Sequence, residues 1–260
     1  MKDFLKRVFL IGAQPASGFG IFANLLLLVL FFAPLAFLVL RGQPFRWSVL
    51  FDYRDVFLRG WLTTIALASS AFVLSSCFGI VIALAKRSSI RIFRMFGHLY
   101  VETIRGTPLL VQLLFFFYVV ANALHAENRY IDGCIILSIF AGAYIAEIIR
   151  SGIESIRDSQ IQAARSLGFS KPQIYVYVIF PQAFRQVLPP LAGQFASLIK
   201  DSSLLSILGI GEFTFSAELV NSVTYSTLES FFPLAVGYLV LTLPISLWSK
   251  RLETRYRYET

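Results

Sequence analysis

The chain has 260 residues, of which 57% are hydrophobic and only 15% are charged, and its mean hydropathy is +0.70. A soluble domain carries about 25% charged residues and could not hide this much apolar surface in one core, and a disordered chain lacks such surface. The composition therefore excludes both classes and indicates an all-α, polytopic membrane protein.

Candidate membrane spans follow from the apolar runs. A helix rises about 1.5 Å per residue, so about 20 apolar residues cross a hydrocarbon layer of about 30 Å. Four runs without Asp, Glu, Lys or Arg meet this length, and they are Ile21–Leu40, Trp61–Ala85, Gly106–Ala126 and Ser230–Ser249. Two less clean runs are Ile131–Ile149, which carries Glu147, and Pro181–Ile199, in which Pro189-Pro190 should interrupt the helix. We therefore predict six transmembrane helices.

The first span could be read as a signal peptide, because Lys2, Lys6 and Arg7 precede it. Its apolar run of about 20 residues is longer than the 7–15 of a signal sequence, and no small-x-small cleavage site follows it. We expect an uncleaved anchor span.

The distribution of positive charge predicts the orientation. With the N-terminus inside, 17 of the 23 Lys and Arg residues fall in inner segments and only 6 in outer ones. Cytoplasmic loops are enriched in Lys and Arg, so both termini should be cytoplasmic. Membrane topology thus accounts for the net charge of +8 without a nucleic-acid partner.

Cysteine and histidine carry little information. Cys77 and Cys134 lie in apolar runs, where a lone thiol usually packs as a small hydrophobic group, and His98 and His125 are isolated. No metal-ligand spacing occurs, so we predict no metal site.

The longest inner connection, residues 150–180, has the pattern of two short helices. Asp158 or Ser159 can cap the first, and Gly168 stands where it would end in the left-handed conformation. Ser170 can then cap a second helix that has Pro172 in its first turn. This segment is either a solvated turn or a docking element for a partner.

The same segment resembles a known motif. Gln162-Ala163-Ala164, three residues, Gly168, and then Val178-x-Phe180-Pro181 are similar to the cytoplasmic EAA loop of ABC importer permeases. That pattern reads Glu-Ala-Ala, three residues, Gly, nine residues, Ile, one residue, Leu-Pro. Val178 and Phe180 keep the apolar character of the positions that they occupy, whereas Gln162 lacks the carboxylate.

Further segments resemble the polar amino acid permeases within that family, and they occur in the expected order. They are Gly60-x-x-Thr63-Thr64, Glu102–Gln112, Ala143–Ile153, Gln182–Arg185, Leu188–Leu191 and Lys200–Leu204. The resemblance covers about residues 60–250. It implies an extra N-terminal span and outer loop in residues 1–58, and a five-helix permease domain in residues 59–260 whose EAA loop is 158–181.

The resemblance also implies partners. Such a permease pairs with a second membrane subunit, identical or related, in the bacterial inner membrane. Two ATPase subunits bind below, and a soluble solute-binding protein delivers the amino acid. This chain has no G-x-x-x-x-G-K-[ST] motif, so we expect a non-catalytic transport subunit without a cofactor of its own. ATP and Mg would be bound by the partner ATPase.

Candidate site residues fall into three groups. The ATPase-coupling residues are Gln162, Ala163, Ala164, Arg165, Leu167 and Gly168. The substrate-pathway residues are Gln194, Lys200, Asp201, Ser202 and Ser203, because polar groups at membrane depth are functional by default; Lys200 and Asp201 could instead pair with each other at the outer interface. The gate residues are Leu204, Gly209 and Gly211, in a segment that is either a re-entrant helix or an outer surface loop.

Several alternatives stay open. Glu102 with Arg105, and Glu147 with Arg150, have i,i+3 spacing and are expected to form helix pairs rather than to contact substrate. An ion-coupled secondary amino acid transporter is the main rival function, although no internal repeat is evident. A membrane enzyme lacks a nucleophile signature such as G-x-S-x-G, and a purely structural membrane subunit would not need the polar cluster. The transported amino acid (glutamine, glutamate, arginine, histidine, lysine or cystine) and the choice between homodimer and heterodimer are open.

Overall fold

The computed structural model of the protein describes residues 45–256, and residues 1–44 and 257–260 lie outside that description. The predicted first span, Ile21–Leu40, falls in the undescribed part. The chain divides into two compact units, Met1–Arg46 and Trp47–Thr260, and only the second is treated below. Between residues 45 and 256 the protein is helical and contains no β-strand. The all-α prediction is confirmed for this part.

Three described helices are long and apolar enough to cross a membrane unbroken. They are α4 (Arg54–Lys86), α7 (Arg129–Glu154) and α12 (Thr227–Tyr256). They coincide with the predicted spans that begin at Trp61, Ile131 and Ser230. A short helix, α3 (Ser48–Asp52), precedes α4 and contacts α12.

A fourth candidate span is bent. Helix α5 (Arg91–Gly106) meets α6 (Leu109–Phe115) and the π-helix η1 (Phe116–Ala121) at an angle of 108°. The break falls at Thr107, whose extended backbone (φ −120°, ψ 145°) is what a residue before proline prefers. The expected bend at Gly106-Thr107-Pro108 is present, and the predicted span 106–126 is the second arm of this pair.

The fifth candidate span is also a bent pair. Its first arm runs through α9 (Lys171–Ile174), the π-helix η2 (Tyr175–Ile179), α10 (Phe180–Asp201) and the 3-10 helix η3 (Ser202–Leu208), and its second arm is α11 (Phe213–Thr224). The arms differ in direction by 46°. A separate helix, α8 (Asp158–Ser166), connects α7 to α9.

The prediction that Pro189-Pro190 interrupts the helix is wrong. Helix α10 continues through both prolines, and the Ser249 hydroxyl of α12 donates a hydrogen bond to the Pro189 carbonyl at 2.8 Å. Helix α10 packs against α12, and the irregular backbone lies instead between α10 and α11.

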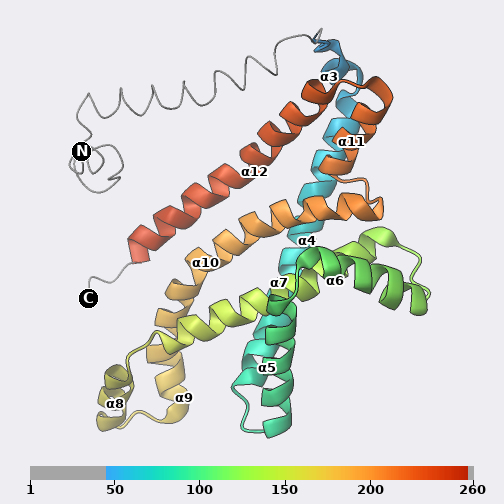
Figure 1. Cartoon of the computed structure of the whole chain (residues 1–260). Helices are drawn as coiled ribbons and strands as arrows, with labels where there is room; N and C mark the ends of the chain where they lie inside the picture. Colours follow the sequence, from blue (N-terminus) through green and yellow to red (C-terminus); the bar gives the residue numbers. More distant parts are fainter. Residues whose placement is uncertain (1–44, 257–260) are drawn as a thin grey trace, which may run out of the picture. The chain divides into compact units, whose positions relative to one another are not determined.

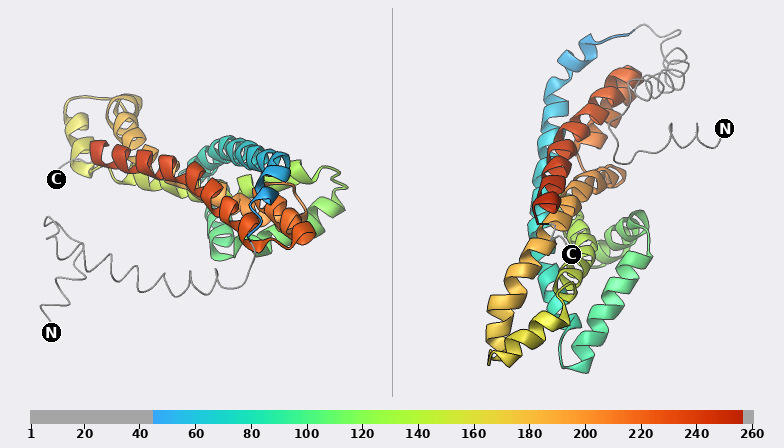
Figure 2. Two further views of the ribbon diagram at one scale, coloured as in Figure 1. Left: turned by 90° about the horizontal axis from the view of Figure 1, so that it is seen from above. Right: turned by 90° about the vertical axis from the view of Figure 1, so that its left-hand side faces the viewer.

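Helix α7 is the central element. It packs most extensively on α4 and also contacts α10 and α5 (Figure 1). In the most apolar 18-residue stretch of α7, 56% of the residues are buried, against 6% in the corresponding stretch of α12. The main core includes Leu113 of α6, Leu137 of α7, Leu198 of α10 and Leu205 of η3, all fully buried. Figure 2 shows α12 running along one side of this core, beside α10.

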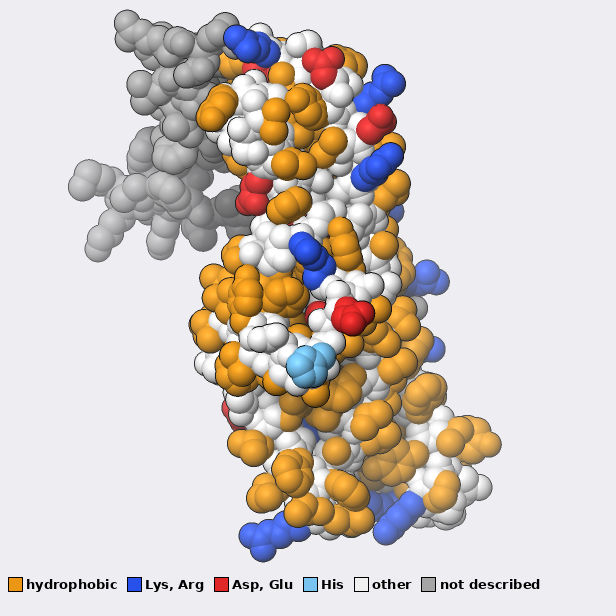
Figure 3. Space-filling model, turned by 90° about the vertical axis from the view of Figure 1, so that its right-hand side faces the viewer, with side chains coloured by type: hydrophobic (Ala, Val, Ile, Leu, Met, Phe, Trp, Pro, Cys, Tyr) orange, Lys and Arg blue, Asp and Glu red, His pale blue; other side chains and the backbone are white. Residues whose placement is uncertain are grey.

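Large apolar side chains cover much of the surface. Figure 3 shows them over much of one face, with Lys and Arg side chains scattered between them from its upper to its lower end. Exposed examples are Val81 and Leu84 on α4, Phe96 on α5 and Trp248 on α12. A water-soluble protein rarely exposes patches of this extent, whereas lipid or a second membrane subunit covers them.

Candidate functional site

The predicted helix pair in the long inner connection is present as α8 and α9. Both lie at the end of the described unit remote from α3 and α11 (Figures 1 and 2). Gly168 has φ +82°, its N–H donates to the Arg165 carbonyl at 2.9 Å, and the Phe169 N–H donates to the Ala164 carbonyl at 3.1 Å. These two bonds close a Schellman motif. The left-handed helix end expected at Gly168 is confirmed.

The helix starts differ from one another. Helix α8 begins at Asp158 with Arg157 in the N-cap position and no side-chain cap, so the expected capping by Asp158 or Ser159 is wrong. In α9 the Ser170 N–H donates to Gln173 Oε1 at 2.8 Å, and Pro172 lies in the first turn, as predicted.

A small core of its own holds the pair together. It consists of Ile156, Ala164, Ile174, Ile179 and Ala183, all buried. Ala164 therefore faces α9 and η2. Of the two alanines predicted as coupling residues, Ala164 is buried between the helices and Ala163 is exposed. Their coupling role stays a prediction.

The outer surface of the pair holds the other five predicted coupling residues. Gln162, Ala163, Arg165, Leu167 and Gly168 are all exposed, with 77% of Leu167 accessible. Aromatic side chains continue this exposed surface, and they are Phe169, Tyr175, Tyr177, Phe180 and Phe184. We call these ten residues the coupling surface. An exposed apolar patch of this kind marks a protein or membrane contact.

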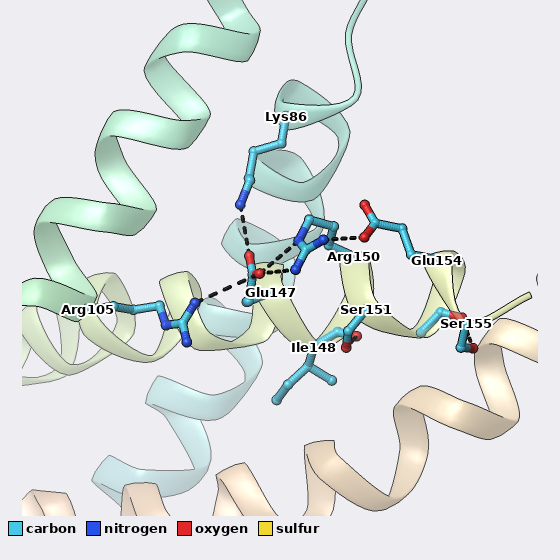
Figure 4. A network of polar contacts seen from close by, with 9 residues as sticks. Lys86, Arg105, Glu147, Ile148, Arg150, Ser151, Glu154 and Ser155 are labelled. Atoms are coloured by element: carbon cyan, nitrogen blue, oxygen red, sulfur yellow. Dashed lines mark hydrogen bonds and ion pairs between the residues drawn. The ribbon is translucent and has the colours of Figure 1, made fainter.

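A carboxylate near the base of the pair joins three helices. Glu147 of α7 accepts from Lys86 Nζ of α4 at 2.8 Å and from Arg150 Nε at 2.7 Å, and Arg105 Nη1 of α5 lies 3.9 Å from it (Figure 4). Arg150 also pairs with Glu154 at the end of α7. The expected Glu147–Arg150 pair is confirmed. The expected pair of Glu102 with Arg105 is not found among the ion pairs of residues 45–256.

The predicted substrate-pathway residues follow one another along α10 and η3. Ser202 is fully buried and its hydroxyl donates to the Ile199 carbonyl at 2.8 Å. Lys200 is exposed, whereas Gln194, Asp201 and Ser203 are half-buried. No ion pair joins Lys200 to Asp201 in the described part of the chain. Their assignment to the substrate path stays a prediction.

The predicted gate is a packed segment. Leu204 lies in η3, which ends at Gly209 with φ +68°, and Gly211 follows before α11. The Gly209 carbonyl accepts from Arg129 Nη1 at 3.1 Å. Leu208 and Ile210 are buried here. The alternative of a loop lying on the outer surface does not fit this burial.

Sequence reasoning missed Glu212, the carboxylate that follows this segment. It is fully buried and caps α11, accepting from the backbone N–H groups of Thr214 at 2.9 Å and Phe215 at 2.8 Å. Thr64 of α4 donates to it at 3.3 Å and Tyr238 of α12 at 2.9 Å. Glu212 is the one charged residue of the apolar segment Leu204–Phe215, and a lone carboxylate in such a segment could have marked it as a candidate site residue.

Thr64 completes this junction between α4, α11 and α12. Its hydroxyl oxygen also accepts from the Phe213 N–H at 3.1 Å. One turn earlier, a Cβ on Gly60 would lie 2.1 Å from Ser216 Oγ and 2.9 Å from the Glu212 carbonyl. The Gly60-x-x-Thr63-Thr64 segment therefore brings the backbone of α4 close to α11 and holds it there.

Metal chemistry gains no support from the described residues. Cys134 is buried, as expected of a small packed side chain, whereas Cys77 is exposed on α4. Residues 45–256 contain no group of three or more His, Cys, Asp or Glu side chains that could hold a metal ion. The absence of a metal site from the whole chain stays a prediction.

Comparison with known proteins decides what these features belong to. The family described as "Binding-protein-dependent transport system inner membrane component" matches residues 75–258. The chain belongs to this family. It is a permease subunit of an ABC transporter, as the resemblance implied, and a multi-pass membrane protein.

Relatives of this permease are similar along most of its length. The probable glutamine ABC transporter permease protein GlnM of Bacillus subtilis (strain 168) is 35% identical over 208 residues, which cover 80% of this chain and 96% of that protein. The glutamine transport system permease protein GlnP of Escherichia coli (strain K12) is 30% identical over 222 residues, covering 83% and 99%.

Solved structures agree with this assignment. An amino acid ABC transporter crystallised with histidines superposes with a TM-score of 0.77 at 36% identity, over 82% of this permease and 100% of that chain. An inward-facing MetNI methionine ABC transporter superposes with a TM-score of 0.66 at 16% identity, over 79% and 98%, which shows a shared fold alone.

Proposed function

We propose that this permease translocates polar amino acids, with glutamine as the first candidate, across the inner membrane in an ATP-driven importer. The coupling surface, which lies on α8, the turn after it, η2 and the start of α10, carries this proposal. It is an exposed helix pair that resembles the EAA loop, and it is rigidly closed at Gly168. Relatives named as glutamine permeases support the substrate class. Glutamate, arginine and histidine belong to the same class.

The partners follow from the family. Two ATPase subunits, which bind ATP and Mg, would dock on the coupling surface, and a solute-binding protein would deliver substrate at the opposite side. A second permease subunit would cover part of the exposed apolar surface. Bacillus subtilis has two distinct relatives, GlnM and GlnP, both named as glutamine permeases, which supports a pair of related subunits. The charge distribution supports cytoplasmic termini.

Transport would follow from movement of the helix pair. A conformational change needs a contact that differs between the two states of the partner. Closure of the ATPases on ATP would displace α8 and α9, and α7 and α10 would move with them because they continue directly from either side of the pair. The EAA pattern has Glu where this chain has Gln162, so this side chain can form a hydrogen bond with the ATPase but not an ion pair.

An uptake assay in proteoliposomes tests this function. The permease is reconstituted with its ATPase and solute-binding protein, and a panel of labelled amino acids is offered with and without ATP. We expect ATP-dependent uptake of glutamine or a similar polar amino acid. Uptake that follows an ion gradient without ATP would support the secondary-transporter alternative instead.

A substitution at the tip of the pair tests the coupling. Gly168→Asp places a charged side chain on the surface that would meet the ATPase; the added Cβ would have no atom within 4 Å, although the φ of +82° strains any side chain at this position. We expect membrane insertion to persist and ATP-dependent uptake to be lost. Gln160→Ala, on the same helix and exposed but outside the coupling surface, is the matched control. Normal uptake by the Gly168 variant would contradict the proposal.

A further inference from the structure

The carboxylate of Glu147 is held unequally by the two helices that reach it from outside α7. Lys86 Nζ lies 2.8 Å away, and only 4% of the Lys86 side chain is exposed. Arg105 Nη1 lies 3.9 Å away, and 41% of the Arg105 side chain is exposed. A buried ion pair resists separation because either partner alone would be left uncompensated, whereas an exposed, longer pair exchanges readily with water. The contact from α4 is therefore tight, and that from α5 is loose.

The stem of Lys86 is packed as well as its head. A Cβ on Gly97 of α5 would lie 2.8 Å from Lys86 Cγ and 3.2 Å from the Lys86 backbone nitrogen. Because Gly97 has no side chain, the aliphatic part of Lys86 lies directly against the backbone of α5. The ammonium group of Lys86 is bound to Glu147 of α7. Around Lys86 and Glu147, helix α5 contributes the apolar surface at Gly97, and Arg105, which makes the long contact to Glu147 and lies 5.6 Å from the centroid of the Tyr144 ring. About two turns away along α7, the Tyr100 hydroxyl of α5 donates a hydrogen bond to the Ile139 carbonyl.

Glu147 is also connected to the coupling surface. Arg150 bonds to Glu147 on one side and to Glu154, the last residue of α7, on the other (Figure 4). Only residues 155–157 separate α7 from α8. In the last two turns of α7, a chain of ion pairs therefore runs from Glu154, next to the helix pair, through Arg150 to Glu147 and on to Lys86 at the end of α4.

We propose that Glu147 is a positioning residue that makes α4 and α7 move as one body when α8 is displaced, while α5 slides past them. This inference rests on the proposed function, because it assigns a path to the motion that the ATPases would impose. Lys86 stays bound to Glu147 throughout, and Arg105 leaves and rejoins it. Glu147 touches no substrate in this role, and its effect lies in the efficiency with which ATP hydrolysis drives import.

The ratio of ATP hydrolysed to amino acid imported tests this role. In proteoliposomes that contain the complete importer, we expect Glu147→Gln to raise the ratio about tenfold, within the range of allosteric coupling energies. Arg105→Met should raise it far less. Glu102→Gln, an exposed carboxylate one turn from Arg105, is the matched control and should leave it unchanged. An unchanged ratio in an assembled Glu147→Gln importer would overturn the proposal.

A double variant separates positioning from folding. Glu147→Gln alone leaves the buried Lys86 charge unpaired and could impair assembly. Lys86→Met together with Glu147→Gln removes both charges and should restore assembly, while the ratio stays raised because the bond between α4 and α7 is lost. Restoration of assembly with a normal ratio would show that Glu147 acts only in stability and would overturn the proposal.

Distance measurements test the motion directly. Spin labels are attached at the exposed positions Leu84 of α4, Leu99 of α5 and Ser151 of α7, in a chain whose Cys77 and Cys134 are replaced by alanine. On ATP binding we expect the Leu99–Ser151 distance to change and the Leu84–Ser151 distance to stay constant. The reverse pattern, or equal changes, would overturn the proposal. Wild-type importer that takes up no amino acid would contradict the proposed function itself, and this inference with it.

Discussion

Two carboxylates sit at helix junctions of this permease, and they are held in opposite ways. Glu212 is fully buried and accepts only from neutral donors, which are two backbone N–H groups and the hydroxyls of Thr64 and Tyr238. Glu147 keeps 20% of its side chain exposed and is surrounded by the cations of Lys86, Arg105 and Arg150. The first junction joins α4, α11 and α12, and the second joins α4, α5 and α7.

The difference concerns mobility. Hydrogen bonds from backbone and hydroxyl donors are directional, and a buried carboxylate that loses them has no water to replace them. Ion pairs tolerate a wider range of geometry, and an exposed guanidinium can leave and return. The Glu212 junction therefore suits a fixed point between helices, and the Glu147 junction suits a place where one helix moves past two others.

The largest effect is expected for Glu212→Ala. It leaves the Thr214 and Phe215 N–H groups and the Thr64 hydroxyl without this buried acceptor, whereas the Tyr238 hydroxyl keeps Thr214 as a partner. Each unsatisfied group costs about 1–3 kcal/mol, so the loss should reach about 5 kcal/mol. We expect a strongly lowered melting temperature in detergent and a poor yield of folded protein. Glu218→Ala, exposed on the same helix, provides the reference. Equal melting temperatures for the two variants would show that the junction does not stabilise the fold.

Glu147→Ala should destabilise less, by about 3 kcal/mol, the lower end for breaking a buried ion pair. Lys86 loses its partner, but Arg105 and Arg150 are partly exposed and can be solvated. The melting temperature in detergent measures this loss. If Glu147→Ala proves more harmful than Glu212→Ala, the contrast between the two junctions is reversed.

Gly97→Ala narrows the contact between α5 and the stem of Lys86. The added methyl would meet Lys86 Cγ at 2.8 Å, so the side chain must shift, at an expected cost of about 2 kcal/mol. We expect a moderate fall in melting temperature together with slower transport, since α5 no longer slides freely. Met95→Ala, exposed on the same helix, is the control. Unimpaired transport by the Gly97 variant would argue against sliding at this contact.

Thr64→Val sharpens the contrast at the Glu212 junction. Valine has nearly the same shape, but it neither donates to Glu212 nor accepts from the Phe213 N–H, and the expected loss is about 1 kcal/mol. Thr64→Ser keeps both bonds and should retain most of the stability. Thermal unfolding of the two variants in detergent compares them, and a serine variant as unstable as the valine one would point to packing of the methyl group instead.

The smallest effect is expected for Glu102→Gln. This carboxylate is exposed and forms no ion pair among residues 45–256, so the stability should change by less than about 0.5 kcal/mol. The melting temperature again serves as the measurement. A large shift would indicate a partner on another subunit of the importer.

Local patterns accounted for much of the architecture. The apolar lengths of α4, α7 and α12, the bend before Pro108 and the left-handed end at Gly168 each depend on neighbouring residues, and the sequence alone predicts them. The exposed coupling residues follow from the same short segment. The inward-facing Ala164 does not, because only the packing of α8 on α9 and η2 selects one alanine over the next.

Long-range contacts account for the rest. Lys86 and Glu147 lie 61 residues apart, and Thr64 and Glu212 lie 148 apart, so no local spacing pairs them. The helix is unbroken at Pro189-Pro190, where Ser249 of α12 donates to the Pro189 carbonyl. Arg105 lies within ion-pair distance of Glu147, which is far from it in sequence, and does not pair with Glu102, which is three residues away. The wrong pairing of Arg105 thus arises where a distant segment overrides a local preference.

The small core of the α8–α9 pair has a consequence for how such importers diversify. Its buried members all come from one short stretch of chain, from Ile156 to Ala183, and its turn is closed by bonds between neighbouring residues. The outward side chains can therefore mutate without disturbing the spans above them. Substitutions on this outer face would therefore change what the pair can bind and leave the packing of the membrane-spanning helices as it is.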